Sequence, residues 1–160
     1  MTLNIRAARP GEAPLVLQLI RELAEYEKLL HEMVATDEMM DAALFGPEPR
    51  AFCDIAEWDG EPVGLALWFY NFSTFEGRAG IYLEDLFVRP ELRGKGIGKS
   101  LMVRLAARCR DEGLARLEWS VLDWNTPSID FYRSRGAELM DGWTTCRVSG
   151  DALVKLAEDA

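Results

Sequence analysis

The chain has 160 residues, a size that fits one compact domain with a hydrophobic core of ordinary dimensions. Hydrophobic residues make up 49% and charged residues 28%, which excludes a disordered composition, and the formal net charge of −9 argues against a broad basic surface for nucleic acid or an anionic membrane. Three widely separated cysteines and one histidine argue against a zinc site or a disulfide framework. We therefore expect no metal, buried thiols and a reducing, cytoplasmic compartment.

The first ninety residues carry the patterns of four strands and two helices. Alternation predicts a strand at residues 3–8, and apolar spacing predicts a helix over residues 13–30. The segment TDEMMDAALFG predicts a second helix with Thr36 as its N-cap and Gly46 as its stop. Three strand-like runs follow, and an Asp-Gly hairpin signal joins the first two: residues 51–58, 61–73 and 79–88.

The second half predicts two further strands and three helices. The predicted elements are a helix at 97–112 stopped by Gly113, a strand at 114–124, a short helix at 125–136 with Thr126 as its cap, a strand at 143–150 and a helical end at 151–160. Hairpins in the middle and crossovers later imply an α/β fold with a mixed, mostly antiparallel sheet and helices on both faces. No linker or repeat interrupts the pattern, so residues 1–160 are expected to form a single domain.

A glycine-rich segment, ELRGKGIGKS at residues 91–100, looks like a phosphate cradle. The Walker A pattern needs a glycine where Arg93 stands, and the dinucleotide pattern needs one where Lys99 stands, so a P-loop nucleotide hydrolase is only a minor alternative. A helix N-terminus still leaves N–H groups unpaired, and glycines let a phosphate approach them closely. A plain helix cap with solvated charges is the competing interpretation, and three alternating glycines make it less natural.

The segment RGKGIG resembles the [R/Q]xxGx[G/A] signature of the GCN5-related N-acetyltransferases (GNAT). Four blocks, ELAEYEKL, YLEDLFV, RGKGIG and WNTPSIDFYRSRGA, together resemble the diamine (spermidine/spermine) acetyltransferase branch across nearly the whole chain. The resemblance implies the GNAT fold and acetyl-CoA as co-substrate. It also implies acetyl transfer to a primary amine of a small molecule, either a polyamine or diamine or a lysine-like amino acid such as thialysine.

The same resemblance implies a cofactor site. The glycine loop is expected to bind the pyrophosphate, and the strand before it is expected to bind the pantetheine arm through its main chain. Two residues near the short helix match positions that contact cofactor or substrate. The implied residues are Leu86, Phe87, Val88, Arg93, Gly94, Lys95, Gly96, Ile97, Gly98, Lys99, Asn125 and Ser128.

The strand IYLEDLFV carries two adjacent carboxylates. In a regular strand successive side chains point to opposite faces. The expected faces are therefore Tyr82, Glu84, Leu86 and Val88 on one side, and Leu83, Asp85 and Phe87 on the other.

Two residues are candidates for proton transfer. The resemblance implies that Glu84 accepts the proton of the amine, through a water, and that Tyr132 protonates the departing thiolate. Both strand carboxylates could instead pair with local donors, and Tyr132 could be a tyrosine whose hydroxyl is satisfied by a neighbour. No cysteine lies in or beside the matched motifs, so transfer is expected to be direct.

The acceptor amine has its own set of candidates. By resemblance, Tyr26, Glu27, Glu84 and Asp141 contact a cationic substrate. The segment between Ala137 and Trp143 is shorter than in the polyamine enzymes, which keeps a free amino acid open as the acceptor. Such a substrate carries a carboxylate and would need an arginine nearby, for example Arg133 or Arg135.

Two further expectations concern activity and assembly. The alternative function is a non-catalytic module that binds acetyl-CoA as a sensor or interaction protein. The resemblance also implies a homodimer, with strands exchanged or sheets joined near the C-terminus. No nucleic acid or membrane partner is expected.

Overall fold

A computed structural model describes residues 1–159. The chain divides into two compact units, Met1–Ser120 and the part from Val121 onward. The elements of the first unit are β1 (Leu3–Ala7), α1 (Ala13–Tyr26), η1 (Leu30–Glu32), α2 (Asp37–Phe45), β2 (Phe52–Trp58), β3 (Glu61–Ser73), β4 (Arg78–Val88), η2 (Pro90–Leu92), α3 (Ile97–Glu112) and β5 (Leu117–Trp119). Among residues 1–159, no helix is both long and apolar enough to cross a membrane.

The five strands form one mixed sheet in the order β1-β2-β3-β4-β5. Strands β1 to β4 are antiparallel neighbours, and β5 runs parallel to β4. The turn between β2 and β3 has Asp59 at φ 51° and Gly60 at φ 87°, the pair of positive angles that a two-residue hairpin requires. The mixed, mostly antiparallel sheet predicted from the sequence is therefore confirmed.

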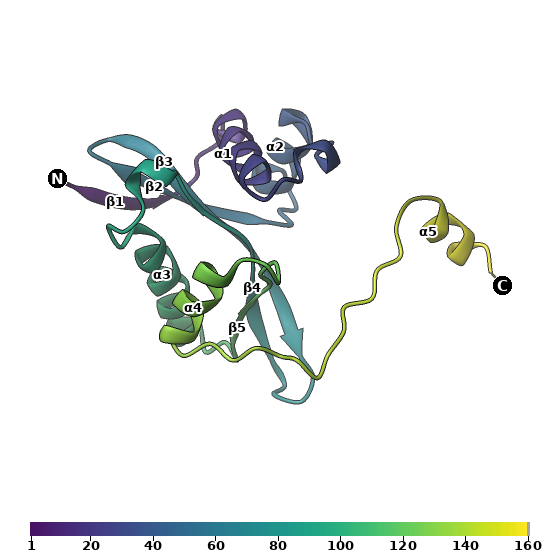
Figure 1. Ribbon diagram of the computed structural model, residues 1–160. Helices are drawn as coiled ribbons and strands as arrows, with labels where there is room; N and C mark the ends of the chain where they lie inside the picture. Colours follow the sequence, from purple (N-terminus) through teal and green to yellow (C-terminus); the bar gives the residue numbers. More distant parts are fainter. Residues whose placement is uncertain (160) are drawn as a thin grey trace. The chain divides into compact units, whose positions relative to one another are not determined.

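Helices cover both faces of this sheet, as expected (Figure 1). On one face, α1 and α2 pack through Val16, Leu19, Leu23 and Leu44 onto the strands. On the other face, α3 packs through Ile97, Leu101 and Leu105. The apolar spacing in α1 and α3 thus places a buried stripe of each helix against the sheet, and burial of each such side chain contributes about 1.5–3 kcal/mol.

The helix boundaries follow local capping chemistry. Thr36 Oγ1 accepts a hydrogen bond from the Met39 N–H at 3.2 Å and so begins α2, as predicted. Gly113 adopts φ 69° and ends α3, also as predicted. Helix α1 ends at Tyr26 rather than continuing to Leu30, because Lys28 adopts a left-handed φ of 62°, which cannot continue a helix.

An irregularity in the β3–β4 ladder corrects the expected faces of β4. Leu67 pairs with Asp85 but Trp68 pairs with Leu83, so Glu84 is an extra residue in a β-bulge. Leu83 packs in the core beneath α3, together with Leu86 and Val88, whereas Phe87 packs in the core beneath α1. The strict two-residue alternation predicted from the sequence is wrong here, since the bulge shifts it by one position.

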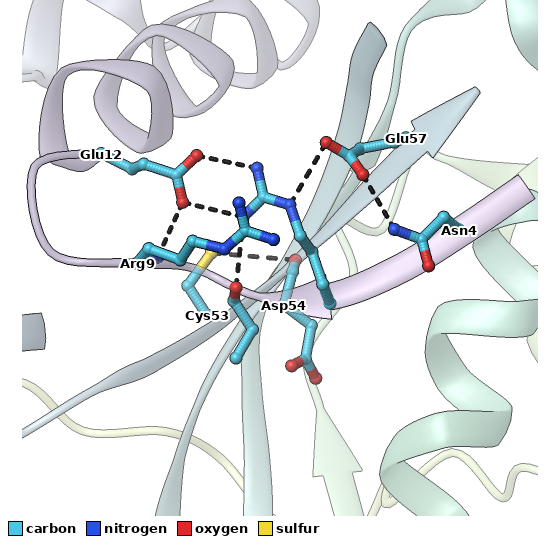
Figure 2. A network of polar contacts seen from close by, with 8 residues as sticks. Asn4, Arg9, Glu12, Cys53, Asp54 and Glu57 are labelled. Carbon is cyan, nitrogen blue, oxygen red and sulfur yellow. Dashed lines mark hydrogen bonds and ion pairs between the residues drawn. The ribbon is translucent and has the colours of Figure 1, made fainter. Parts of the chain in front are cut away.

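An ion-pair network fixes the start of α1 to the sheet (Figure 2). The Arg6 guanidinium donates to both Glu12 oxygens, at 2.8 and 2.7 Å, and its Nε lies 3.2 Å from Glu57. Glu57 also accepts from the Asn4 side chain. The hydrogen bonds from Arg6 lower the pKa of the Glu12 carboxyl. Three elements, β1, β2 and the start of α1, are held by this one guanidinium.

A buried carboxylate tethers α3 to the opposite face. Asp54 on β2 is buried, and its Oδ1 lies 3.3 Å from Nε of Arg104 on α3. Burial raises the pKa of Asp54, and the positive charges of Arg104 and Arg108 oppose that shift. The contact ties the helix that begins at the glycine loop to the centre of the sheet.

The second unit contains α4 (Thr126–Ser134) and α5 (Gly150–Ala157). Asn125, not Thr126, is the N-cap of α4, because its Oδ1 accepts from the Ser128 N–H. The strand predicted at 143–150 does not form: residues 143–149 have no regular secondary structure. The strand predicted at 114–124 is limited to β5. Both segments have strand composition, but a strand needs a neighbour to satisfy its main chain.

Candidate active site

The glycine segment forms the entry to α3. Gly94 and Gly96 adopt φ of 79° and 80°, in the left-handed region that side chains disfavour. Gly96 is the N-cap, and it supplies no side-chain hydrogen bond to the helix. The first N–H groups of α3 therefore have no partner within the helix, and they carry the positive end of its dipole.

The glycine at position 98 needs a different explanation. It lies within the first turn of α3 at ordinary helical geometry, and a Cβ placed there would meet only the Val88 side chain, at 3.8 Å. Neither the backbone nor its neighbours require a glycine, although glycine costs a helix about 1 kcal/mol relative to alanine. A ligand that approaches the main chain closely is a physical reason for it, and anions bind at helix N-termini in this way.

Three basic side chains of this segment take different positions. The Lys95 ammonium lies 5.7 Å from the centre of the Trp58 ring at the end of β2. The Lys99 side chain is exposed in the first turn of the helix. Arg93 folds back toward the sheet, where its Nε donates to the Val88 carbonyl at 3.0 Å. The loop thus combines oriented main-chain N–H groups with local positive charge, as the sequence predicted.

Strand β4 has an open edge next to the loop. The β4–β5 ladder pairs only Ile81, Tyr82 and Leu83, with Leu117, Glu118 and Trp119. Within residues 1–159, the stretch from Asp85 to Val88 has strand partners in β3 alone. Main-chain groups of Leu86, Phe87 and Val88 on that edge are therefore positioned to meet an extended ligand, the arrangement expected for a pantetheine arm.

The bulge presents two carboxylates. Glu84 is exposed and Asp85 is half-buried. Neither accepts a side-chain hydrogen bond or forms an ion pair in the described part of the chain. The alternative in which both pair with local donors therefore gains no support from the ion pairs and side-chain hydrogen bonds of residues 1–159.

For Asp85 the sequence predicted a face of the strand but no role in the site. Burial raises its pKa to about 7, and the negative charges of Glu84 and Glu27 add to that effect. Burial also raises the pKa of Glu27, which directly follows α1. Three carboxylates therefore gather where the end of α1 meets the bulge, and this arrangement attracts a cation.

The Tyr26–Glu27 pair lies beside the glycine loop as well. The Arg93 guanidinium carbon lies 4.5 Å from the centre of the Tyr26 ring and 5.8 Å from that of Phe87. Sequence reasoning assigned Tyr26 to the acceptor and Arg93 to the cofactor loop without relating them. The packing brings the two motifs into contact.

Four predicted residues, Asn125, Ser128, Tyr132 and Asp141, belong to the second unit. Asn125 and Ser128 form the cap of α4. The Tyr132 ring lies 5.7 Å from the Phe131 ring, and its carbonyl accepts from the Arg135 and Ala137 N–H groups at the end of α4. The three carboxylates of Glu27, Glu84 and Asp85 and the glycine loop all belong to the first unit.

The cysteines are not alike. Cys53 and Cys109 are buried, and burial raises the pKa of both thiols. Cys146 is exposed, so the expectation that all three thiols are buried is wrong for this one. Among residues 1–159, no group of three or more His, Cys, Asp and Glu side chains is arranged to hold a metal ion.

Solved structures identify the fold as that of the acetyltransferases. An integron cassette protein from the mobile metagenome of V. cholerae superposes with a TM-score of 0.82 at 26% identity, covering 99% of both chains. An aminoglycoside acetyltransferase from an uncultured soil metagenomic sample superposes with a TM-score of 0.77 at 19% identity, covering 92% of this chain and 97% of the other.

Relatives found by sequence similarity indicate a narrower class of acetyltransferase than the fold does. The thialysine N-epsilon-acetyltransferase of Bos taurus is 41% identical over 96% of both chains. The L-ornithine N5-acetyltransferase NATA1 of Arabidopsis thaliana is 30% identical over 94% of this chain and 86% of its own length. A human spermidine/spermine N(1)-acetyltransferase-like protein is 33% identical over 96% of this chain but 24% of its own.

The acetyltransferase (GNAT) family profile matches residues 16–137. The chain therefore belongs to the GNAT acetyltransferase family, in its diamine acetyltransferase-like branch. The predicted family, fold and class of enzyme, an N-acetyltransferase, are confirmed.

Proposed function

We propose that this protein transfers the acetyl group of acetyl-CoA to a primary amine of a small molecule. The observation that carries the proposal is the glycine loop at the start of α3. Gly98 leaves room there that the protein itself does not need, beside an open edge of β4 and a group of carboxylates. Bound acetyl-CoA supplies an activated thioester, and the protein's residues bind it, position it and move protons.

The loop residues from Arg93 to Lys99 hold the pyrophosphate through main-chain N–H groups, with Lys95 and Lys99 adding positive charge. The open edge of β4 at Leu86, Phe87 and Val88 binds the pantetheine arm through its main chain. Asn125 and Ser128 contact the cofactor or the substrate from α4. The positive φ angles of Gly94 and Gly96 support the first of these assignments, and the short β4–β5 ladder supports the second.

Glu84 accepts the proton that the ammonium must lose before it can attack, acting through a water. Its place in a bulge, exposed and without a hydrogen-bonded partner among residues 1–159, leaves its oxygens available. A main-chain N–H of the open β4 edge stabilises the oxyanion. The Tyr132 hydroxyl gives its proton to the departing thiolate.

The acceptor amine binds among Tyr26, Glu27, Glu84 and Asp141, to which we add Asp85. The pKa of Asp85, raised by burial and then by the negative charges of Glu84 and Glu27, supports this assignment, because a bound ammonium would offset that negative charge. Relatives named for thialysine and L-ornithine favour amino acids with a side-chain amine, and the spermidine/spermine acetyltransferase-like relative keeps polyamines open.

Transfer is direct, in a complex that holds both substrates. The thiols of Cys53 and Cys109 are buried with raised pKa values, which makes them poor nucleophiles. Three cysteines without a disulfide suit a reducing compartment, and we propose a cytoplasmic location. We also propose that both units belong to a single acetyltransferase domain, because the family match spans the boundary between them.

We further propose a homodimer formed through the C-terminal segment. Residues 143–149 have strand composition but no strand partner within residues 1–159, Trp143 is 80% exposed, and α5 carries exposed Leu153 and Leu156. Such side chains on a surface favour burial against another chain. No nucleic acid or membrane partner is proposed.

A panel of amines with a thiol-release readout tests the activity. Putrescine, spermidine, lysine analogues, L-ornithine and amino sugars are each offered with acetyl-CoA. Release of coenzyme A with at least one amine supports the proposal. Tight acetyl-CoA binding without release against any amine would instead support the non-catalytic sensor.

A further inference from the structure

The cofactor loop contributes one side chain that turns away from the loop. Arg93 is anchored by its Nε to the Val88 carbonyl at 3.0 Å, and its guanidinium lies over the Tyr26 and Phe87 rings. Stacking uses the faces of the guanidinium and leaves the N–H groups at its rim free to donate in its plane. The side chain therefore presents a fixed fork of donors next to the proposed acceptor residues.

Arg93 differs from three other arginines of the first unit in having no carboxylate partner within the described chain. Arg6, Arg89 and Arg104 are each held by a carboxylate of the protein, from Glu12, Glu22 and Asp54. Arg93 takes part in none of the ion pairs formed within residues 1–159, and its side chain is exposed. A stacked, always-charged fork without an internal counter-ion is suited to bind a carboxylate bidentately.

Carboxylates stand near these two rings in the sequence of the same two segments. Glu27 directly follows Tyr26, and Asp85 stands two positions before Phe87, so each ring that holds Arg93 adjoins a carboxylate. A diamine offers only cations to such a place. An amino acid with a side-chain amine offers a cation to the carboxylates and an anion to the arginine.

We propose that the Arg93 side chain binds the α-carboxylate of an amino-acid acceptor, and so selects amino acids with a side-chain amine over the corresponding diamines. The inference rests on the proposed function and deepens it. Main-chain groups of the loop serve the pyrophosphate, whereas this one side chain serves the acceptor. Arg93 replaces Arg133 and Arg135, the candidates that sequence reasoning suggested for this role.

Two substrate pairs isolate the carboxylate. L-Ornithine and putrescine differ by that group alone, as do L-lysine and cadaverine. The kcat/KM of each amine is measured at saturating acetyl-CoA for the wild type and for Arg93→Gln, a replacement that the family signature accepts at this position. The wild type is expected to prefer the amino acid of each pair, and Arg93→Gln is expected to lower that preference at least tenfold.

Any weakening of cofactor binding affects both members of a pair alike and cancels in the ratio. Arg21→Gln, which removes an arginine of α1 that bonds only Gln18 within the described chain, is the matched control and should leave the ratio unchanged. If Arg93→Gln has too little activity to measure, Arg93→Lys is read instead. Lysine keeps the positive charge but lacks the planar pair of donors. The variant's preference for the amino acid over the diamine is therefore expected to lie between that of the wild type and no preference.

An unchanged ratio in the variants overturns the inference, as does a wild type that prefers the diamine, and in both cases the acetyltransferase proposal stands. Absence of thiol release with every amine would overturn the proposed function together with this inference. The two failures are therefore distinguishable in one set of assays.

Discussion

Leu83 and Phe87 lie four residues apart on β4, yet they pack on opposite faces of the sheet. Leu83 lies in the core beneath α3, and Phe87 lies in the core beneath α1. The bulge at Glu84 accounts for this, because one unpaired residue reverses the alternation of all that follow it. The same bulge gives the strand a carboxylate that is not committed to either core, next to the edge proposed for the cofactor.

Glu84→Gln tests the role of that carboxylate. The amide cannot accept a proton, so only amine that is already neutral in solution can react. We expect kcat to fall by about 10²-fold at neutral pH and the pH–rate profile to move upward. Glu76→Gln, at the turn after β3, is the control. An unchanged profile in Glu84→Gln would mean that another base acts, or none.

Gly98→Ala separates the demands of the fold from those of the cofactor. The added methyl meets only Val88, at an ordinary contact distance, and alanine favours a helix by about 1 kcal/mol. The variant should therefore unfold at the same or a higher temperature, while its affinity for acetyl-CoA falls at least tenfold. Calorimetry measures both quantities.

The control for this variant is Val103→Ala on the exposed face of the same helix, which should leave the affinity unchanged. Undiminished binding of acetyl-CoA by Gly98→Ala would show that the pyrophosphate lies elsewhere.

Much of the fold could be predicted because it depends on local signals. Thr36, the Asp59–Gly60 turn and Gly113 each act through their own backbone, so the sequence indicates them directly. The bulge at Glu84 could not be predicted, since it depends on how β3 pairs with β4. The strand expected at 143–150 has the right composition, but composition does not supply a neighbouring strand.

In the candidate site, too, local features can be predicted from the sequence, whereas features that depend on packing cannot. The glycine loop is contiguous, and its phosphate chemistry can be predicted from the sequence. The behaviour of Asp85 depends on Glu27, which is 58 positions away and is brought close only by the packing of α1 on the sheet. Likewise, the contact between Arg93 and Tyr26 joins two motifs that are unrelated in the sequence.

Asp85 should make stability depend on pH. Its pKa is raised from 3.8 to about 7, so between these values the folded protein holds a proton that the unfolded chain has released. Stability contributed by this group is therefore present below pH 4 and is lost as the pH rises toward 7, with a slope of at most about 1.4 kcal/mol per pH unit.

Asp85→Asn removes this titration. Denaturant unfolding at several pH values should show the variant gaining stability relative to wild type between pH 4 and pH 7. Asp123→Asn, at an exposed position of the second unit, is the control and should leave the pH dependence as it is. Parallel curves for wild type and Asp85→Asn would contradict the raised pKa.

Tyr132→Phe tests the proposed general acid. The variant keeps the aromatic ring but lacks the hydroxyl, so the thiolate must depart without a proton from this residue. We expect kcat to fall by about 10²-fold or more, with acetyl-CoA binding retained. Tyr70→Phe, which removes a surface hydroxyl that donates to Glu112 at 2.8 Å, is the matched control. Wild-type turnover in Tyr132→Phe would remove this residue from the mechanism.

The C-terminal segment should decide the oligomeric state. Residues 143–149 combine strand-forming Trp143, Thr144 and Val148 with no strand partner among residues 1–159, and the exposed apolar side chains of α5 follow directly. Ending the chain after Gly142 should convert a dimer into a monomer in sedimentation velocity. Val103→Ala, on the exposed face of α3, should sediment as the wild type does. If the full chain sediments as a monomer while amides 143–149 are protected from hydrogen exchange, the segment pairs with its own chain and the dimer proposal is wrong.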